Sequence, residues 1–233
     1  VLDGGAPQIV EFDMGQDAID AMADLDVRMS KIQGDRMDLD NSLKIATDGR
    51  NLTMYPALAN LGAPDRQHSR VEHAADLIWQ VHRDHADLHI PADKYGPEMT
   101  GVFQLVFCDR GTPNPRAGAG SRNLYTELRD ALVARGMKRE EIAFMHDYDS
   151  PKAKARLVEA CNDGRIRVLL TSTKKGGTGL NVQRALKQMI NMDPAWTAAD
   201  MEQRLGRIIR QGNVHERVQV VNMVARRSFD AMM

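Results

Sequence analysis

The sequence has few cysteines that could form disulfides or bind metals, and it has no long apolar run that could span a membrane. Only 2 of its 233 residues are cysteines, and Cys108 and Cys161 fall inside apolar segments without metal-type spacing. This usage is typical of a reduced, intracellular protein, so we expect a cytoplasmic location with both thiols in the core. No apolar run approaches the roughly 20 residues that cross a bilayer, and no membrane partner is expected. There is no signal peptide, and a start at Val1 rather than Met is compatible with a fragment.

The chain also lacks a large net charge of either sign, because 31 Lys and Arg residues nearly balance 32 Asp and Glu residues. The two ends nevertheless differ. Residues 1–40 carry ten acidic side chains against three basic ones, and residues 164–217 carry ten basic side chains against four acidic ones. A basic C-terminal half suits a phosphate ligand, either nucleotide or nucleic acid. A solvated surface without a ligand is the alternative that charge alone leaves open.

From residue 100 onward, short apolar runs alternate with helical patterns. Most runs are nearly continuous in apolar residues, as expected for strands covered on both faces of a parallel sheet. The runs are Gln104–Asp109, Ile142–Asp147, Arg167–Ser172, Gln188–Asp193 and Val218–Ala225. Helices with suitable cap residues are predicted between them, over 121–136, over 150–164 and from 197 onward. This order predicts an α/β fold with a parallel sheet flanked by helices.

Residues 1–100 lack this alternation. Residues 18–33 and 66–88 are predicted to be helices, and Pro91–Thr100 is predicted to be a loop or linker. The segment Ile45–Ala59 is ambiguous, because Pro56 opposes a single helix there. We therefore predict a helical accessory region over residues 1–100 and an α/β lobe over residues 101–233.

The first candidate site is the glycine-rich segment Thr171–Gln183, which directly follows a predicted strand. Open α/β folds bind ligands at the carboxyl ends of their strands. Glycines let backbone N–H groups approach an anion closely. Lys174 and Lys175 precede these glycines, so the segment is not the G-x-x-x-x-G-K-[ST] loop that wraps phosphates. A plain tight turn is the alternative.

The second candidate site is a polar stripe on the last predicted helix. Gln203, Arg207 and Arg210 stand at positions i, i+4 and i+7, so they share one face. The opposite face carries apolar residues that can pack on the sheet: Met201, Leu205 and Ile208. Two arginines and a glutamine form a strong site for a multiply charged phosphate. A solvated basic stripe is the alternative.

Together the two segments resemble motifs V and VI of superfamily-2 helicases. Their order is a glycine-rich T-G-x-N loop, a strand and a Q-x-x-G-R-x-x-R helix. Upstream, Leu105–Arg110 stands where the family has motif IV, and His146–Leu170 resembles the stretch before motif V in Swi/Snf-type translocases. The resemblance covers roughly residues 101–230 and implies the second, C-terminal RecA-like lobe of the motor. Asp48–Arg50 and Ser228–Ala231 also resemble parts of large phage and plasmid proteins that fuse a helicase to a methyltransferase-like region.

The resemblance implies roles for individual residues in ATP hydrolysis. Arg210 would match the arginine finger and Arg207 its companion, both reaching the γ-phosphate, and Gln203 would order that phosphate or the attacking water. Three residues of the glycine-rich segment would face the nucleotide: Gly177, Gly179 and Asn181. Ile208 and Ile209 replace the Gly or Thr of the family pattern, which puts the detailed nucleotide contacts in doubt.

The resemblance also implies a nucleic-acid partner, DNA rather than RNA. Ser172, Thr173 and Lys174 would contact its backbone at the strand end, which gives affinity without sequence information. Arg116, in the loop 111–120, would reach the same partner. An ordinary mobile loop is the alternative reading of that segment.

Two family motifs are absent from the sequence. Neither G-x-x-x-x-G-K-[ST] nor D-E-x-[DH] occurs, and in the family these motifs belong to a first lobe that wraps the phosphates and holds Mg²⁺. We therefore expect a missing N-terminal lobe to bind ATP and Mg²⁺, and this chain to be inactive alone. No metal site is expected from the H-x₂-H-x₃-H spacing of His82, His85 and His89.

Two alternatives remain at this point. The chain could be a degenerate RecA-like module that binds nucleic acid or a protein and has no role in ATP hydrolysis. It could also be a stand-alone α/β enzyme with a small phosphorylated substrate, for which His146 and Asp147 are the only candidate catalytic groups.

Overall fold

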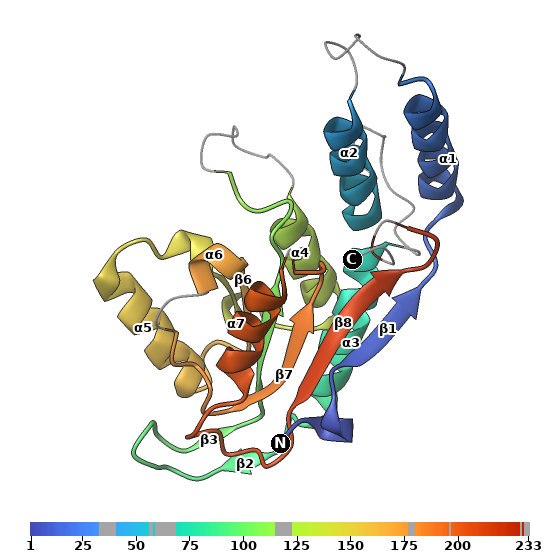
Figure 1. Cartoon of the computed structure of the whole chain (residues 1–233). Helices are drawn as coiled ribbons and strands as arrows, with labels where there is room; N and C mark the ends of the chain where they lie inside the picture. Colours follow the sequence, from blue (N-terminus) through green and yellow to red (C-terminus); the bar gives the residue numbers. More distant parts are fainter. Residues whose placement is uncertain are drawn as a thin grey trace.

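A computed structural model describes residues 1–32, 41–55, 58, 69–114, 123–176, 180–195, 197–228 and 230. Its centre is a six-stranded parallel sheet with the strand order β1-β8-β7-β4-β6-β5 (Figure 1). The strands are β1 (Gln8–Phe12), β4 (Phe103–Phe107), β5 (Ile142–Phe144), β6 (Val168–Thr171), β7 (Leu186–Asn191) and β8 (Gln219–Ala225). Two further short strands, β2 (His89–Ile90) and β3 (Met99–Thr100), form an antiparallel pair. The five predicted strands and the parallel α/β class are confirmed.

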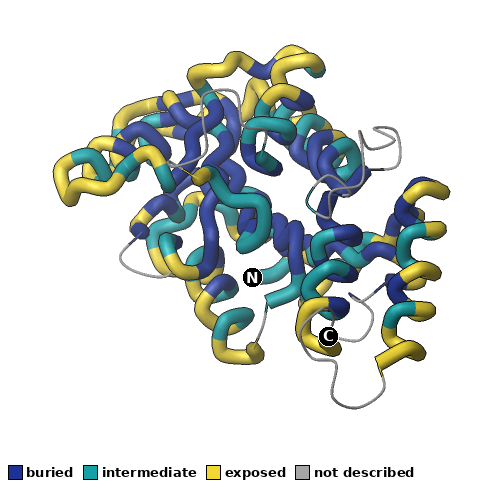
Figure 2. Tube along the Cα trace, turned by 90° about the horizontal axis from the view of Figure 1, so that it is seen from above, coloured by how far each residue is buried: buried dark blue, intermediate teal, exposed yellow. Residues whose placement is uncertain are grey.

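Helices cover both faces of the sheet. One face packs on α3 (Arg70–Asp84) and α4 (Leu124–Arg135), and the other packs on α5 (Pro151–Asn162) and α7 (Ala198–Ile208). A single turn, α6 (Thr173–Gly176), follows β6, and short 3-10 turns lie at Asp3–Gly5, Arg139–Glu141 and Met145–Asp147. In Figure 2 the buried positions run along the strands and the exposed ones along the outer turns of the helices. Among the described residues, no helix is long and apolar enough to cross a membrane.

The helix ends follow the local chemistry of the sequence. Ser150 caps α5 by accepting a hydrogen bond from the Ala153 N–H, and Thr197 caps α7 in the same way from the Asp200 N–H. Gly136 ends α4 in the left-handed conformation (φ 114°), as predicted. The start of α4 differs from the prediction: Asn123 is its N-cap, and Ser121 lies outside the described residues.

Residues before 100 take part in the same core as the rest of the chain. Strand β1 lies at the edge of the sheet, parallel to β8, and α3 packs beside α4. The sequence analysis missed β1. The exposure of its five side chains alternates, and so short a pattern indicates a strand only when its partner β8, about 200 residues later, is known. The division of the chain at residue 100 stays a prediction.

Helices α1 (Gln16–Ser30) and α2 (Ser42–Met54) form a pair that projects from the lobe (Figure 1). They share a small apolar cluster of Leu25, Ile45 and Leu52. The ambiguous segment after residue 45 is helical up to Met54, two residues before Pro56, because a helix ends before the residue that precedes a proline.

Arg70 ties the projecting pair to the sheet. Its guanidinium is fully buried, pairs with Asp230 and donates to the backbone carbonyls of Thr53 at the end of α2 and of Met192 and Met223 beside β7 and β8. Asp230 also accepts from the Ala225 N–H. A buried ion pair is stable only when its remaining hydrogen-bonding groups find partners, and here they do.

Replacing Arg70 with Met is expected to lower the free energy of unfolding by about 3–5 kcal/mol, because the carboxylate of Asp230 stays buried without a cation. Urea denaturation of the chain measures this loss. Arg226→Met is the control, since Arg226 pairs with Glu11 and Asp13 near the same end of β8 but is exposed. Equal losses in the two variants would contradict this account of Arg70.

Candidate functional site

The carboxyl ends of β4, β6 and β7 meet at a buried arginine of α7. Arg204 is fully buried, and its guanidinium Nη2 lies 2.8 Å from Asp109 Oδ2 and 3.3 Å from Asp193 Oδ1. Its Nε donates to Thr173 Oγ1 at 2.8 Å, and its Nη1 donates to Asn191 Oδ1 and to the Asp193 carbonyl. One side chain thereby joins three loops that follow three different strands.

The two aspartates are also fixed by each other and by Thr173. Asp109 accepts from the backbone N–H and the hydroxyl of Thr173, at 2.6 and 2.7 Å, and its own N–H donates to Asp193 Oδ2 at 2.7 Å. Burial raises the pKa of the Asp193 carboxyl, while the positive charge of Arg204 opposes that rise. The hydroxyl of Thr173, a predicted nucleic-acid contact, is therefore already engaged within the protein.

Helix α7 carries only part of the predicted polar stripe, because it ends at Ile208 and Ile209 is not helical: Arg210 lies two residues beyond its end. Gln203 and Arg210 are exposed, Arg207 is half-buried, and Ile208 packs into the core. Burial and the nearby charge of Arg210 both lower the pKa of Arg207, although a guanidinium stays protonated at neutral pH. Two neighbouring guanidinium groups favour a bound anion, because the anion offsets their mutual repulsion.

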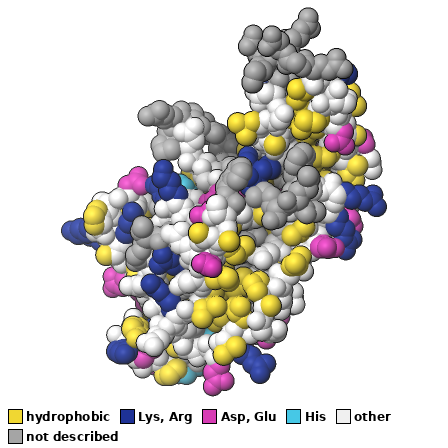
Figure 3. Space-filling view, in the orientation of Figure 1, with side chains coloured by type: hydrophobic (Ala, Val, Ile, Leu, Met, Phe, Trp, Pro, Cys, Tyr) yellow, Lys and Arg dark blue, Asp and Glu magenta, His cyan; other side chains and the backbone are white. Residues whose placement is uncertain are grey.

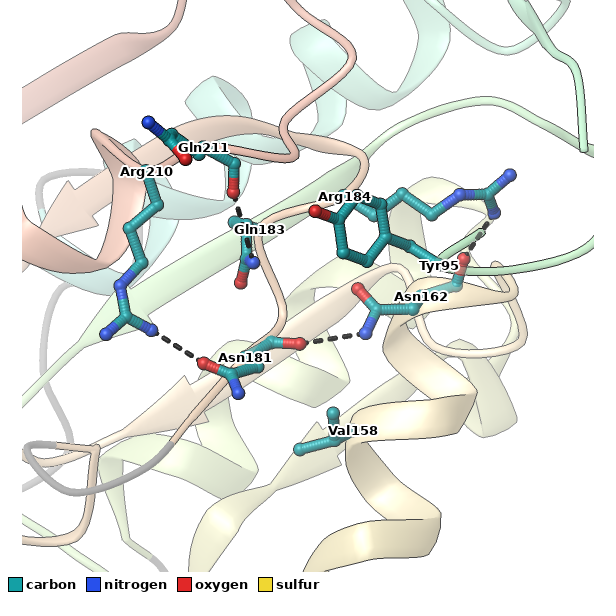
Figure 4. Close-up of a pocket in the computed structure, with 8 residues that line it drawn as sticks. All are labelled: Tyr95, Val158, Asn162, Asn181, Gln183, Arg184, Arg210 and Gln211. Atoms are coloured by element: carbon teal, nitrogen blue, oxygen red, sulfur yellow. Dashed lines mark hydrogen bonds between the residues drawn. The ribbon is translucent and has the colours of Figure 1, made fainter. Parts of the chain in front are cut away.

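Arg210 lines a cavity of about 470 Å³ beside α7 (Figure 4). Its Nη1 donates to Asn181 Oδ1 at 2.7 Å, so the structure brings these two predicted nucleotide contacts together. Tyr95 and Arg184 lie on the other side of this cavity. Arg184 is buried and holds the loop of Tyr95 through a 3.0 Å bond to Asp93. The volume is within the range of about 300–1,000 Å³ of small-molecule sites.

A second cavity, of about 750 Å³, lies nearer the strand ends and is lined by Gln203 together with Lys154, Lys174 and Lys175. Lys174 is exposed, whereas Lys175 bonds Asp149 at 2.6 Å. Lys and Arg side chains gather over α5, α6 and α7 in Figure 3. Gln203 on α7 and Arg210 beyond its end thus line different cavities, and the helix face predicted to carry both stops at Ile208.

Several sequence-based candidates fall elsewhere. Ser172 is buried next to Thr173, and Gly177, Gly179 and Arg116 lie outside the described residues. In the described part of the chain, no cluster of three His, Cys, Asp or Glu residues could hold a metal ion. The three spaced histidines have separate partners: His82 stacks on Trp79, His85 bonds the Val81 carbonyl, and His89 lies 3.6 Å from Glu98. Cys108 and Cys161 are buried free thiols.

The candidate groups of a stand-alone enzyme are poorly arranged for catalysis. His146 is half-buried with its ring edge against Tyr125, and burial together with the charge of Lys175 lowers its pKa. Asp147 is exposed on the adjoining turn. Neither residue bonds a side chain that resembles a nucleophile, and a base and nucleophile in such a site need hydrogen-bond contact.

The sequence analysis missed the cluster of Arg204, Asp109 and Asp193. A signal was present, because Arg204 stands four residues before the buried Ile208 and so falls on the core-facing side of the helix. Asp109 and Asp193 also close two of the predicted strands. Acidic groups at neighbouring strand ends together with a core-facing arginine predict a buried ion pair.

Comparison with known protein families gives a match for the part of the chain that contains most of the site residues. Residues 121–212 match the helicase conserved C-terminal domain. The chain is 34% identical over 106 residues to DNA repair protein rad5 of Neurospora crassa, a match that spans 44% of this chain and 8% of that protein. It is 39% identical over 67 residues to the uncharacterized ATP-dependent helicase YqhH of Bacillus subtilis, over 29% of this chain and 12% of that protein. The chain therefore spans a small fraction of these relatives.

The fold is similar to that of solved C-terminal ATPase domains. The structure of the C-terminal part of the Fun30 ATPase domain superposes with a TM-score of 0.65 at 12% identity, over 97% of this chain and 87% of that one. The SWI2/SNF2 ATPase C-terminal domain of Sulfolobus solfataricus gives 0.62 at 13% identity, over 97% and 82%. These solved structures show that the sheet is RecA-like. Together with the match of residues 121–212, they support the sequence resemblance to the C-terminal lobe of superfamily-2 helicases of the Swi/Snf type.

The turn that follows Arg210 makes the stability of the lobe depend on pH. His215 lies in this turn with its Nε2 3.3 Å from the Ala185 carbonyl, and burial lowers the pKa of His215 to about 4. In the unfolded chain, the His215 imidazole takes up a proton near pH 6.5. The contribution of His215 to stability is therefore fully present above that pH and is lost as the pH falls towards 4. When the pH is lowered from about 7.5 to about 5, the melting temperature of the His215→Gln variant is expected to fall less than that of the unaltered chain. Equal losses would exclude this role, since His82 and His146 titrate in both proteins.

Proposed function

We propose that this chain is the second motor lobe of an ATP-dependent DNA translocase. It completes an ATP site whose phosphate-binding loop and Mg²⁺ ligands come from a first lobe, and it grips the DNA backbone at the carboxyl ends of its strands. The observation that carries the proposal is the outward position of Arg207 on α7 and of Arg210 two residues beyond its end, where Arg210 bonds Asn181. We infer that these two arginines meet the γ-phosphate held by another lobe.

The DNA contact is supported by the lysines of the cavity beside α6, which three aspartates (Asp109, Asp149 and Asp200) also line. Lys174 is exposed there, and the backbone of α6 leads directly from Ser172 and Thr173. Contacts of this kind neutralise phosphates and carry no sequence information. A SWI2/SNF2 ATPase core of Sulfolobus solfataricus, solved in complex with double-stranded DNA, shares the fold with a TM-score of 0.60 at 16% identity, over 97% of this chain and 42% of that chain.

ATP hydrolysis tests the motor role. Hydrolysis is expected in the protein that carries this chain together with its first lobe, and it is expected to be negligible in the isolated chain. Arg210→Ala should lower kcat by about 10³-fold or more, because the finger acts on charge that develops in the transition state. The control is Arg165→Ala, an exposed arginine that pairs with Asp163.

Each outcome decides between the candidate functions. Activity in the isolated chain would favour a self-contained phosphate-handling enzyme. Absence of activity in both proteins would favour a degenerate binding module. An Arg210→Ala protein as active as the control would exclude the finger role.

DNA affinity at several salt concentrations tests the grip. Lys174→Ala is expected to weaken binding equally for different sequences and to reduce the slope of log K against log salt by about one. Lys187→Ala is the matched control, because Lys187 stands at the amino end of β7 and bonds the Arg217 carbonyl. An equal effect in both variants would mean that the chain binds DNA only through its overall charge.

A further inference from the structure

Arg204 occupies a position between the two functions proposed for this lobe. On one side its Nε donates to Thr173, the first residue of α6. The next residue of α6 is Lys174, which is exposed and lines the larger cavity. On the other side it belongs to α7, between Gln203 and the arginines Arg207 and Arg210. Its guanidinium also bonds Asp109 after β4 and Asn191 at the end of β7.

The contacts of Arg204 leave it little freedom. Its guanidinium also lies over the Phe107 ring, with its central carbon 5.2 Å from the ring centroid. Every guanidinium nitrogen donates to an oxygen of Thr173, Asn191, Asp109 or Asp193. A planar fork fixed at three points moves together with its acceptors, so a shift of Thr173 displaces Arg204 and the helix that carries it.

The stability of the fold does not by itself call for this arrangement. Apolar residues that replace a buried ion pair are often as stabilising as the pair itself. The sheet on this side already packs on apolar residues of α7 such as Ile208. What apolar packing lacks is a directional link between α6 and α7.

We propose that Arg204 is a positioning residue that couples nucleic-acid contact to the arginines of the ATP site. Phosphate contact at α6 moves Thr173, Arg204 follows, and α7 carries Arg210 into or out of register with the γ-phosphate. Arg210 lies two residues beyond the last residue of α7, and its N–H donates to the Ile208 carbonyl. A tilt of α7 at Arg204 therefore also displaces the finger. This inference rests on the proposed function.

The test measures the stimulation of ATP hydrolysis by DNA, as the ratio of kcat with saturating duplex DNA to kcat without it. The protein used carries this chain with its first lobe. Arg204→Lys keeps the charge, but one ammonium group cannot reach Thr173, Asn191 and both carboxylates together. We expect the stimulation ratio to fall about tenfold or more, a coupling loss of about 1.4 kcal/mol.

Arg70→Lys is the matched control. Arg70 is as deeply buried as Arg204 and pairs with a buried carboxylate, but its partners lie on α2, near the ends of β7 and β8 and at Asp230. We expect Arg70→Lys to lower the melting temperature while it leaves the stimulation ratio within about twofold of the unaltered protein.

A second variant keeps the inference testable if Arg204→Lys does not fold. Asp109→Asn preserves the shape of the side chain and removes the charge that holds both Thr173 and Arg204. The same loss of stimulation is expected. A lower melting temperature with an unchanged ratio, in whichever of these variants folds, would show that the cluster is structural and would overturn the inference.

Hydrogen exchange on the isolated chain gives a readout that needs no ATP. DNA is expected to slow amide exchange in residues 172–176 and also in 198–209, and Arg204→Lys should retain only the first effect. Protection of 198–209 in the variant would contradict the coupling.

The inference and the proposed function fail in different ways. Absence of DNA-stimulated hydrolysis in the unaltered protein would overturn both. Loss of hydrolysis in Arg210→Ala, combined with full DNA stimulation in Arg204→Lys, would overturn the inference alone.

Discussion

The ion pairs between Arg204 and the two aspartates at neighbouring strand ends constrain the rest of this lobe. Parallel strands bring Asp109 and Asp193 together at the carboxyl ends of β4 and β7, where burial makes the Asp193 carboxylate costly without a cation. Helix α7 supplies that cation only if it docks with Arg204 facing inward. Its rotation is then fixed, and Gln203 and Arg207 face outward. The site therefore depends on a contact buried beneath it.

A second buried arginine acts on the opposite face of the sheet. Arg70 of α3 joins the end of α2, the ends of β7 and β8, and Asp230. This places Ser228 and Asp230, part of the segment that resembles phage and plasmid proteins, in a structural role at the end of β8. That narrower resemblance stays a prediction. Both arginines act near the carboxyl ends of the strands, where the predicted ligand contacts also lie.

Two of the cavities bear on the proposed function. The smaller cavity contains Arg210 and Asn181, which suits the phosphates and sugar of a nucleotide. The larger one contains the lysines around α6, which suit a polyanionic backbone, although three aspartates also line it. In the proposed function, Arg204 of α7 links the two, because it bonds Thr173 of α6.

The sequence by itself determined the parallel α/β class, the five strands after residue 100, both ends of α5 and the start of α7. These features depend on local chemistry: apolar runs between polar turns, and caps such as Ser150 and Thr197 that bond N–H groups a few residues away. It also predicted one helix face for Gln203, Arg207 and Arg210, but α7 ends at Ile208, so that face does not reach Arg210. The resemblance to superfamily-2 helicases was readable because its motifs are contiguous.

Only the tertiary structure decided which distant groups meet. Strand β1 pairs with β8 across almost the whole chain, and periodicity over five residues cannot reveal such a partner. The engagement of the Thr173 hydroxyl and the separation of Gln203 from Arg210 into different cavities follow from how three strand ends and α7 pack together. Arg204 reads from the sequence as one more basic residue. Burial between two carboxylates, which the sheet brings together from positions 84 residues apart, gives it its role.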